Sequence, residues 1–417
     1  MSKLSNPKIM KIYGSSELHL VLLLSCVSLL NMCCIRADVM SNSLSPNNSI
    51  ESGLSVGGKS GWNTRLLSPK FEDKASTVFF IDSQNGWVGG KRALYKTSNS
   101  GLSWEKIGFP ISEDEFVTEI IFINLANGLV IVKKNITPYS SFTDNKFRIL
   151  STANYGKTWD EINSQDGGVT SVRFDDAGRI WLSGLTYRKK NSPACVNPLL
   201  LTYDIGVAKW NSNESLIEAM TTDTGSAKME CLNKAVMGVD ISSDGKVRII
   251  TSDREIYEEE KSSWKKTYKI NIFDDQGVPS TFGTTDSQFP WFLEGTDSEE
   301  GTRGRLVICS KNGEFNETTH NGYLFTDAVF ISNEEFLISG SKVNLIENKK
   351  TGMFVRSSIG VVLQTVDNGK HFNEIYSSVH EERINRLYKV AKQNKNVWAL
   401  GESGSLVELT RVSEFIK

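Results

Sequence analysis

Few residues in this chain of 417 residues have the types and spacing of a catalytic centre. After the first 37 residues the histidines are His320, His371 and His380, and none has a metal-ligand spacing or a Gly-x-Ser-x-Gly nucleophile motif beside it. Ser262 and Lys265 match Ser-x-x-Lys, but the motifs that accompany it in hydrolases are absent from the sequence. We therefore predict no catalytic residue, no metal ion and no cofactor, and leave residual hydrolase activity open.

The first 37 residues have the pattern of an export signal. Lys3, Lys8 and Lys11 precede an apolar run from residue 18 to 35, and Ala37 follows as a small residue at which cleavage is expected. Two alternatives stay open, a lipid-modified Cys26 and an uncleaved membrane anchor. All three place the rest of the chain outside the cytoplasm, in the periplasm, at a membrane or secreted. Residues 38–60, rich in Ser, Asn and Gly, predict a flexible tether.

The charge balance argues against one class of partner. Without residues 1–37 the chain has 43 basic and 48 acidic residues, a net charge of −5. Nucleic-acid-binding proteins usually carry a basic excess, so we predict no nucleic-acid partner.

A repeat fills the rest of the chain, and it predicts the fold. Each copy has an apolar strand, an Asn/Asp-x-Gly turn, a strand with an aromatic residue and Gly, a third strand, and a second glycine turn that ends in an aromatic residue. The clearest copy runs from Val78 to Trp104. The second glycine turns start at intervals of 49 to 58 residues, the size of a four-stranded propeller blade.

The second glycine turn resembles the Asp-box of bacterial neuraminidase repeats, Ser/Thr-x-Asp-x-Gly-x-Thr-Trp/Phe. Asp or Asn can bond to backbone N–H groups two residues on, and Gly supplies the positive φ of a tight turn. We therefore expect each box to be a structural turn between the third and fourth strands of a blade. Its residues in the three good copies are Asn99, Gly101, Trp104, Asn154, Gly156, Trp159, Asp367, Gly369 and Phe372. Degenerate copies are read at Thr202–Trp210, Thr251–Asp253 and Ser310–Gly313.

These copies predict an all-β domain over residues 61–412, a seven-bladed β-propeller of four-stranded antiparallel blades. Six boxes define six blades, and a seventh, from about Ile384 to Leu409, has only three strands. Trp62–Leu67 is predicted to supply its missing outer strand, because pairing the two ends of the chain closes the ring and removes a free edge. We expect a monomer.

Insertions between second and third strands predict a functional face opposite the boxes. They span residues 133–146, 186–198, 296–304 and 342–358, and the link 215–235 ends on the same face. Tolerated surface drift is the alternative. Tyr187, Arg188, Lys189 and Lys190 form a cationic tip that is either a binding site or a solvated charge run. Cys195 and Cys231 fall on this face, where an oxidising compartment would favour a disulfide.

Two families resemble this repeat. Sialidases carry the Asp-box but also need an arginine triad and an early Arg-Ile-Pro element. No Arg-Ile-Pro occurs in this sequence. The strings Asn85–Gly90 and Thr152–Trp159 are more similar to the propellers of photosystem II stability and assembly factors and their non-photosynthetic bacterial relatives. That resemblance implies a non-catalytic scaffold outside the cytoplasm that binds a protein partner, which is expected to be associated with a membrane. A glycan-binding or glycoside-hydrolysing propeller is the alternative.

Overall fold

The computed structural model describes part of the chain, and the following concerns that part. The described residues are 61–67, 71, 74–134, 146–188, 195–204, 207, 209–223, 232–270, 277, 279–298, 301–310, 314–332, 334–347, 354–378, 384, 386–401 and 404–412. They belong to the second of two compact units, residues 48–417. The predicted export signal and tether lie outside the described residues. Among the described residues, no helix is both long and apolar enough to cross a membrane.

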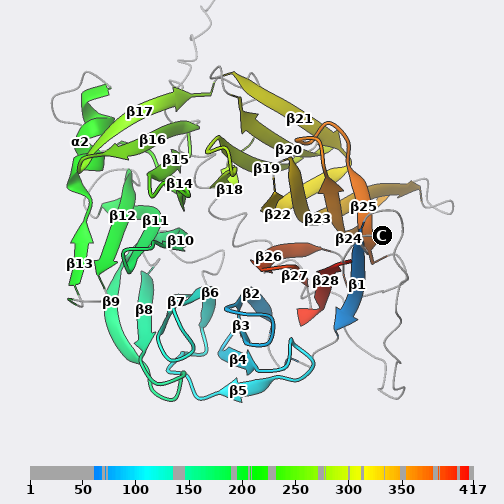
Figure 1. Ribbon diagram of the computed structural model, residues 1–417, viewed down its shortest axis with the longest axis horizontal. Coiled ribbons are helices and arrows are strands. Elements are labelled where there is room, and N and C mark those ends of the chain that lie inside the picture. The colour runs from blue at the N-terminus through cyan, green and yellow to red at the C-terminus, as the bar shows by residue number, and fades with distance from the viewer. Residues whose placement is uncertain are drawn as a thin grey trace, which may run out of the picture. The chain divides into compact units, whose positions relative to one another are not determined.

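Seven four-stranded antiparallel sheets form the propeller, as predicted (Figure 1). Blades 1 to 3 consist of β2 (Ala75–Phe80), β3 (Gly86–Gly90), β4 (Ala93–Thr97), β5 (Glu105–Ile107); β6 (Glu115–Phe122), β7 (Gly128–Lys134), β8 (Lys146–Thr152), β9 (Asp160–Asp166); and β10 (Gly168–Phe174), β11 (Arg179–Arg188), β12 (Cys195–Asp204), β13 (Lys209–Ser212). Blades 4 to 6 consist of β14 (Val236–Ile241), β15 (Val247–Thr251), β16 (Glu255–Glu260), β17 (Ser263–Lys269); β18 (Pro279–Thr284), β19 (Pro290–Ser298), β20 (Gly301–Cys309), β21 (Phe315–Asn321); and β22 (Tyr323–Ser332), β23 (Glu335–Glu347), β24 (Phe354–Thr365), β25 (Asn373–Ser377). Blade 7 consists of β26 (Leu387–Gln393), β27 (Asn396–Gly401), β28 (Leu406–Arg411) and β1 (Trp62–Leu67).

The blades pack face to face through apolar side chains. The second strands are buried on both faces, as in β3 and β15, because each blade lies between two others. Aromatic rings stack across two of these interfaces, Trp87 on Phe122 and Phe80 on Trp398, each pair with ring centroids 3.7 Å apart. Gly86 is needed because a Cβ there would lie 2.5 Å from the Phe80 ring.

Strand β1 closes the ring, which confirms the predicted closure. It pairs with β28 from Trp62↔Arg411 to Leu67↔Leu406 and so becomes the outer strand of blade 7. Glu335 of blade 6 ties this strand down. Its carboxylate accepts a hydrogen bond from Trp62 Nε1 (3.2 Å) and forms an ion pair with Arg411 (2.7 Å).

The three good Asp-boxes occupy turns between third and fourth strands, with one hydrogen-bond pattern. In blade 1, Thr97 Oγ1 accepts the backbone N–H of Gly101 (3.0 Å), and Asn99 Oδ1 accepts that of Ser103 (2.9 Å). Trp104 Nε1 donates to the Gly101 carbonyl (3.0 Å). Ser100 and Gly101 both have positive φ, 61° and 86°. The same bonds recur around Thr152 and, apart from the indole bond, around Thr365.

One degenerate box was placed wrongly. Thr251–Asp253 joins β15 to β16, so it is a second-to-third turn on the opposite face. The third-to-fourth turn of blade 4 is instead the pair Lys261 and Ser262, with φ of 51° and 68°. Positive φ at both central residues is the requirement of a two-residue type I′ hairpin turn, which needs no box.

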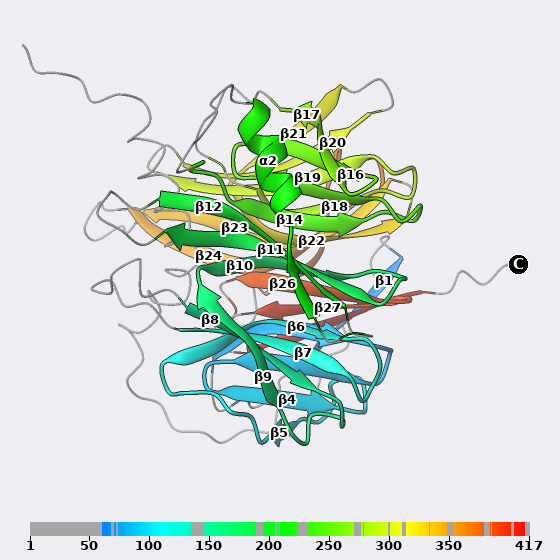
Figure 2. The ribbon, with the colours of Figure 1, turned by 90° about the vertical axis from the view of Figure 1, so that its left-hand side faces the viewer.

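Three predicted loop insertions are largely strand. In blades 3, 5 and 6 the second and third strands continue past the sheet as two-stranded ribbons, here called the ribbons. They comprise the pairs Thr186↔Asn197 to Arg188↔Cys195, Asp297↔Thr302 to Ser298↔Gly301, and Val343↔Ser358 to Glu347↔Phe354. In Figure 2 the ribbons of blades 3 and 6 reach toward the left-hand side. The sequence missed them because pairing continues through residues that were read as loops.

The link after blade 3 contains a helix that was not predicted, α2 (Glu214–Asp223). Leu216 and Met220 on this helix are buried in one cluster with Trp181 and Trp264. Asn213, just before the helix, accepts a hydrogen bond from Trp264 Nε1 (2.8 Å). The link therefore covers apolar surface of blades 3 and 4.

We expect Trp62→Ala to destabilise the propeller far more than its position in a terminal strand would suggest. The side chain is 3% exposed and carries a hydrogen bond between blades, so its removal should cost about 3–5 kcal/mol of unfolding free energy. Urea denaturation measures this. Asn63→Ala, an exposed neighbour in the same strand, should change the value by less than about 0.5 kcal/mol. Equal small effects would mean that β1 is not part of the cooperative ring.

Candidate functional site

The first strand of each blade lines the centre of the ring, and each carries a β-bulge at the same place. The shifts in register fall at residues 75/77, 117/119, 169/171, 236/238, 279/281, 325/327 and 387/389. The bulged residue is Ser or Thr in five blades. Bulges bend a strand and redirect its side chains, so the residues that follow face the channel in a shared register.

Hydrogen bonds from these bulged residues join neighbouring blades. Thr170 Oγ1 donates to the Val236 carbonyl and Thr326 Oγ1 to the Leu387 carbonyl, each at 2.6 Å. The Ser76 hydroxyl donates in the same way to Val117. In blade 7 the Tyr388 hydroxyl donates to the Ala75 carbonyl of blade 1, across the closure. In each case the acceptor directly precedes the bulged residue of the next blade. This bonding fixes the inner strands relative to one another.

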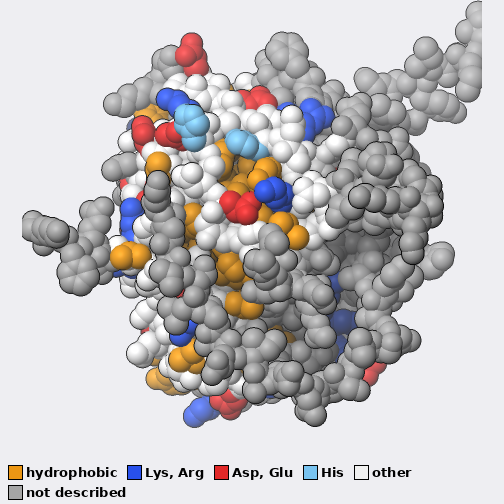
Figure 3. All heavy atoms as spheres, turned by 90° about the vertical axis from the view of Figure 1, so that its right-hand side faces the viewer, with side chains coloured by type: hydrophobic (Ala, Val, Ile, Leu, Met, Phe, Trp, Pro, Cys, Tyr) orange, Lys and Arg blue, Asp and Glu red, His pale blue; other side chains and the backbone are white. Residues whose placement is uncertain are grey.

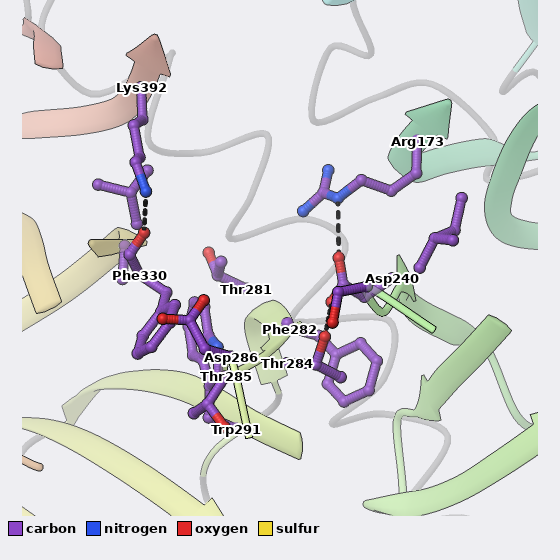
Figure 4. Close-up of a pocket in the computed structure, with 15 residues that line it drawn as sticks. Arg173, Asp240, Thr281, Phe282, Thr284, Thr285, Asp286, Trp291, Phe330 and Lys392 are labelled. Atoms are coloured by element: carbon purple, nitrogen blue, oxygen red, sulfur yellow. Dashed lines mark hydrogen bonds and ion pairs between the residues drawn. The ribbon is translucent and has the colours of Figure 1, made fainter. Parts of the chain in front are cut away.

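A pocket of about 300 Å³ lies at one mouth of the channel (Figure 4). Its walls are the ends of β10, β14, β18, β22 and β26 and the turns that follow β14 and β18. These ends and turns belong to the face of the first-to-second turns, which the Asp-boxes share. The pocket is therefore opposite the face that the sequence favoured.

One wall of the pocket is a chain of polar contacts across three blades. The Arg173 Nε atom of blade 3 lies 3.5 Å from Asp240 Oδ1 of blade 4, and Thr284 of blade 5 donates to Asp240 Oδ2 (2.7 Å). Burial raises the pKa of Asp240, while the Arg173 charge and the Thr284 hydrogen bond oppose that rise. The three side chains point toward one another in Figure 4.

Lys392 of blade 7 stands on the opposite wall, beside Phe330 (Figure 4). Its ammonium group donates to the carbonyls of Phe330 (2.8 Å) and Ile331 (3.1 Å). Burial lowers the pKa of Lys392, and the carboxylates of Asp286 and Glu335 partly restore it. The pocket thus holds one cation and one carboxylate toward each side.

Trp291, at the base of the pocket, has an indole N–H with no hydrogen-bond partner among the described residues. The equivalent Trp181 of blade 3 donates its indole N–H to the Asp175 carboxylate (2.9 Å). Asp175 lies in the turn between the first and second strands of that blade and also accepts backbone N–H groups of this turn. Thr285 occupies the place of Asp175 in blade 5, since each bonds across its turn to the residue four positions on. The indole N–H groups of Trp87 and Trp398, at the same position in blades 1 and 7, likewise have no partner among the described residues. The unpaired Trp291 N–H therefore recurs in the repeat and does not by itself indicate a ligand.

An ion pair on the inner strands stabilises the channel. Lys389 of blade 7 reaches Glu119 of blade 2 (3.1 Å), although blade 1 lies between them. Glu119 and Asp327 raise the pKa of Lys389 against the effect of burial. Asp327 in turn accepts hydrogen bonds from Thr281 (2.7 Å) and from the Val390 N–H (3.0 Å). These charges are satisfied by one another, so we assign them to structure.

The chemistry of the pocket favours binding. Its lining contains two cations, Arg173 and Lys392, and two carboxylates, Asp240 and Asp286, with neither His nor Cys. Arg173 is the one arginine of the lining, whereas a sialidase-like site needs three. The described residues contain no group of His, Cys, Asp and Glu that could hold a metal ion. Among the described residues visible in Figure 3, charged side chains of both signs are interspersed.

None of the described residues that the sequence predicted for a site is in the lining of this pocket. Tyr187 is 7% exposed in the blade 3 ribbon, and Arg188 ends β11. Lys189, Lys190 and Cys231 lie outside the described residues, as does the side chain of Cys195, so the cationic tip and the disulfide stay predictions. Sequence reasoning missed the pocket. Aligning the first strands at their bulges would have shown charged residues, Arg173 and Asp240, at the position held by Phe79 and Ile121 in blades 1 and 2.

Solved structures share this fold at low sequence identity. A structure of YCF48 bound to D1 peptide is 14% identical with a TM-score of 0.54, covering 86% of this chain and 99% of that chain. YCF48 from Cyanidioschyzon merolae is 14% identical with a TM-score of 0.53, covering 83% and 98%. The GH74 xyloglucanase from Xanthomonas campestris is 11% identical with a TM-score of 0.53, covering 85% of this chain and 54% of that chain.

No protein-family model and no curated protein matches the chain. The two YCF48 structures confirm the similarity to the assembly-factor propellers at the level of the fold.

We expect Arg173→Met to raise the pKa of Asp240 further, because the guanidinium is the nearest charge that favours the carboxylate. Titration of the Asp240 carboxyl by NMR measures this. Because folding raises this pKa, the folded chain binds more protons than the unfolded chain between the ordinary and raised values, so Asp240 reduces stability as pH rises through that range. Lys157→Met, an exposed change on the Asp-box rim, should leave the titration unchanged. A pKa insensitive to Arg173→Met would exclude the proposed pairing.

Proposed function

We propose that the chain is a non-catalytic scaffold that binds a protein or complex of the cell envelope through the ribbon face, the face of the second-to-third turns. The observation that carries this proposal is the set of three ribbons in blades 3, 5 and 6, all on one rim of a closed ring. A rigid ring that presents several projecting elements on one side is suited to holding a partner without chemistry.

The blade 6 ribbon has the most paired residues of the three described ribbons, and side-chain contacts hold it where it leaves the sheet. Its strands β23 and β24 stay paired to Glu347↔Phe354, whereas the pairing of β23 with β22 ends at Tyr323↔Lys342. At that point Lys342 forms an ion pair with Glu374 (3.3 Å) and lies 5.6 Å from the Tyr323 ring. The paired backbone limits the conformations of the ribbon, which reduces the entropy that ordering would cost on binding.

Two further observations support a binding role. The described residues of the central pocket lack the arginine set and nucleophile of a sialidase-like enzyme. In addition, a protein of the same fold has been solved with a peptide bound. Glycan binding is a second candidate function, favoured by the mixed charges of the pocket on the other face.

The scaffold is proposed to act outside the cytoplasm, either free or attached to a membrane. Lys3, Lys8 and Lys11 followed by the apolar run at residues 18–35 support export. Residues 38–60 would then give the propeller reach from its point of attachment.

We expect a photo-crosslinking amino acid at Asn344, an exposed residue of the blade 6 ribbon, to yield a discrete protein adduct in isolated envelopes. The same amino acid at Leu102, which is 62% exposed on the Asp-box rim, is the matched control and should give none. Adduct bands are read by immunoblotting and mass spectrometry. Equal adducts at both positions, or none at Asn344, would contradict a partner on the ribbon face.

Export is tested separately. Fused after residue 60, alkaline phosphatase should be active in a bacterial host, because that enzyme needs the disulfides that form outside the cytoplasm. Deleting residues 1–37 should abolish the activity while leaving the fusion in the cytoplasm at a similar level. Activity that survives the deletion, or inactivity of the full fusion, would refute the assignment.

A further inference from the structure

We propose that the channel-mouth pocket binds one neutral sugar ring. The inference deepens the second candidate function, glycan binding, and does not depend on the ribbon face. It rests on the charges, the hydrogen-bonding groups and the size of the pocket.

The charges of the pocket compensate each other. Arg173 faces Asp240 at 3.5 Å, and the Lys392 ammonium group interacts electrostatically with Asp286 across the other side. A ligand with a net charge would gain one attraction and meet one repulsion of similar size. A neutral ligand avoids this cost, so charge balance selects against acidic and basic ligands.

The polar groups offer donors and acceptors side by side. Asp240 and Asp286 are acceptors, while Arg173 and Lys392 are donors. A sugar hydroxyl donates and accepts at once, and so matches such a mixture. Planar guanidinium and carboxylate groups can also engage two adjacent hydroxyls together. A peptide backbone offers fewer groups with both properties.

The apolar part of the lining completes the match. Phe330 is partly exposed and supplies aromatic carbon for the C–H surface of a ring. Gly283 has no side chain, and this allows close contact with Trp291, because a Cβ at this position would lie 2.7 Å from the Trp291 ring. A volume of about 300 Å³ is at the lower end of ligand pockets, which suits one ring.

Saturation-transfer NMR tests the inference on the purified residues 61–417, compared with the full chain in detergent. The probes are glucose, galactose, mannose and N-acetylglucosamine, with glucuronate and glucosamine as charged counterparts. At least one neutral sugar should receive saturation, and its charged counterpart should bind more weakly. Asp240→Asn and Phe330→Ala should each weaken binding about tenfold or more, because each removes a direct contact.

Controls separate this result from misfolding and from the ribbon proposal. Leu102→Ala, on the same rim but away from the pocket, and Asn344→Ala, on the ribbon, should leave sugar binding unchanged. Thermal unfolding confirms that each variant folds, and Lys392→Met offers a second pocket variant on the opposite wall. The inference is overturned if no neutral sugar binds, if glucuronate or glucosamine binds more tightly, or if folded Asp240→Asn and Lys392→Met both bind as wild type. None of these outcomes bears on crosslinking at Asn344.

Discussion

Closure of the ring by β1 is the constraint on which the rest of this structure depends. Without it, blade 7 would have three strands, and the β28 edge would expose unpaired backbone groups. The closing strand also carries Trp62, whose indole reaches Glu335 in blade 6. On the inner side, the Tyr388 hydroxyl bonds to Ala75 only because blades 7 and 1 are held together. Closure therefore fixes contacts between blades both at the outer rim and at the channel.

The fixed inner ring explains how a pocket arises from a repeat. At the third residue after the bulge, Phe79 of blade 1 and Ile121 of blade 2 pack against buried apolar clusters. In blades 3 and 4 the same position holds Arg173 and Asp240, and in blade 7 Lys392 follows that position by one residue. No blade contains the pocket alone. The repeat fixes the positions of the strands, and the charged residues that replace apolar ones at some of these positions form the pocket. Such departures from the repeat pattern are expected at functional sites.

Local patterns predicted the parts of the fold that consecutive residues determine. The Asp-box turns follow from hydrogen bonds between residues two to four positions apart, and the closing strand Trp62–Leu67 follows from a missing fourth strand. Other features depend on contacts that a sequence does not show. Thr251–Asp253 resembles a box but lies on the other face, and Glu214–Asp223 is helical because its apolar side covers two blades. The pocket escaped prediction because its charged residues are far apart in the chain and each, taken alone, reads as surface variation.

Native-state hydrogen exchange tests the central claim, that β1 and the inner strands form one cooperative ring, most directly. Amides of β1 that bond to β28, such as Asn63 and Arg65, should open with the same free energy and the same denaturant dependence as amides of β2 and β26. Exchange of β1 through local opening at a much lower free energy, with β2 and β26 still protected, would contradict the claim.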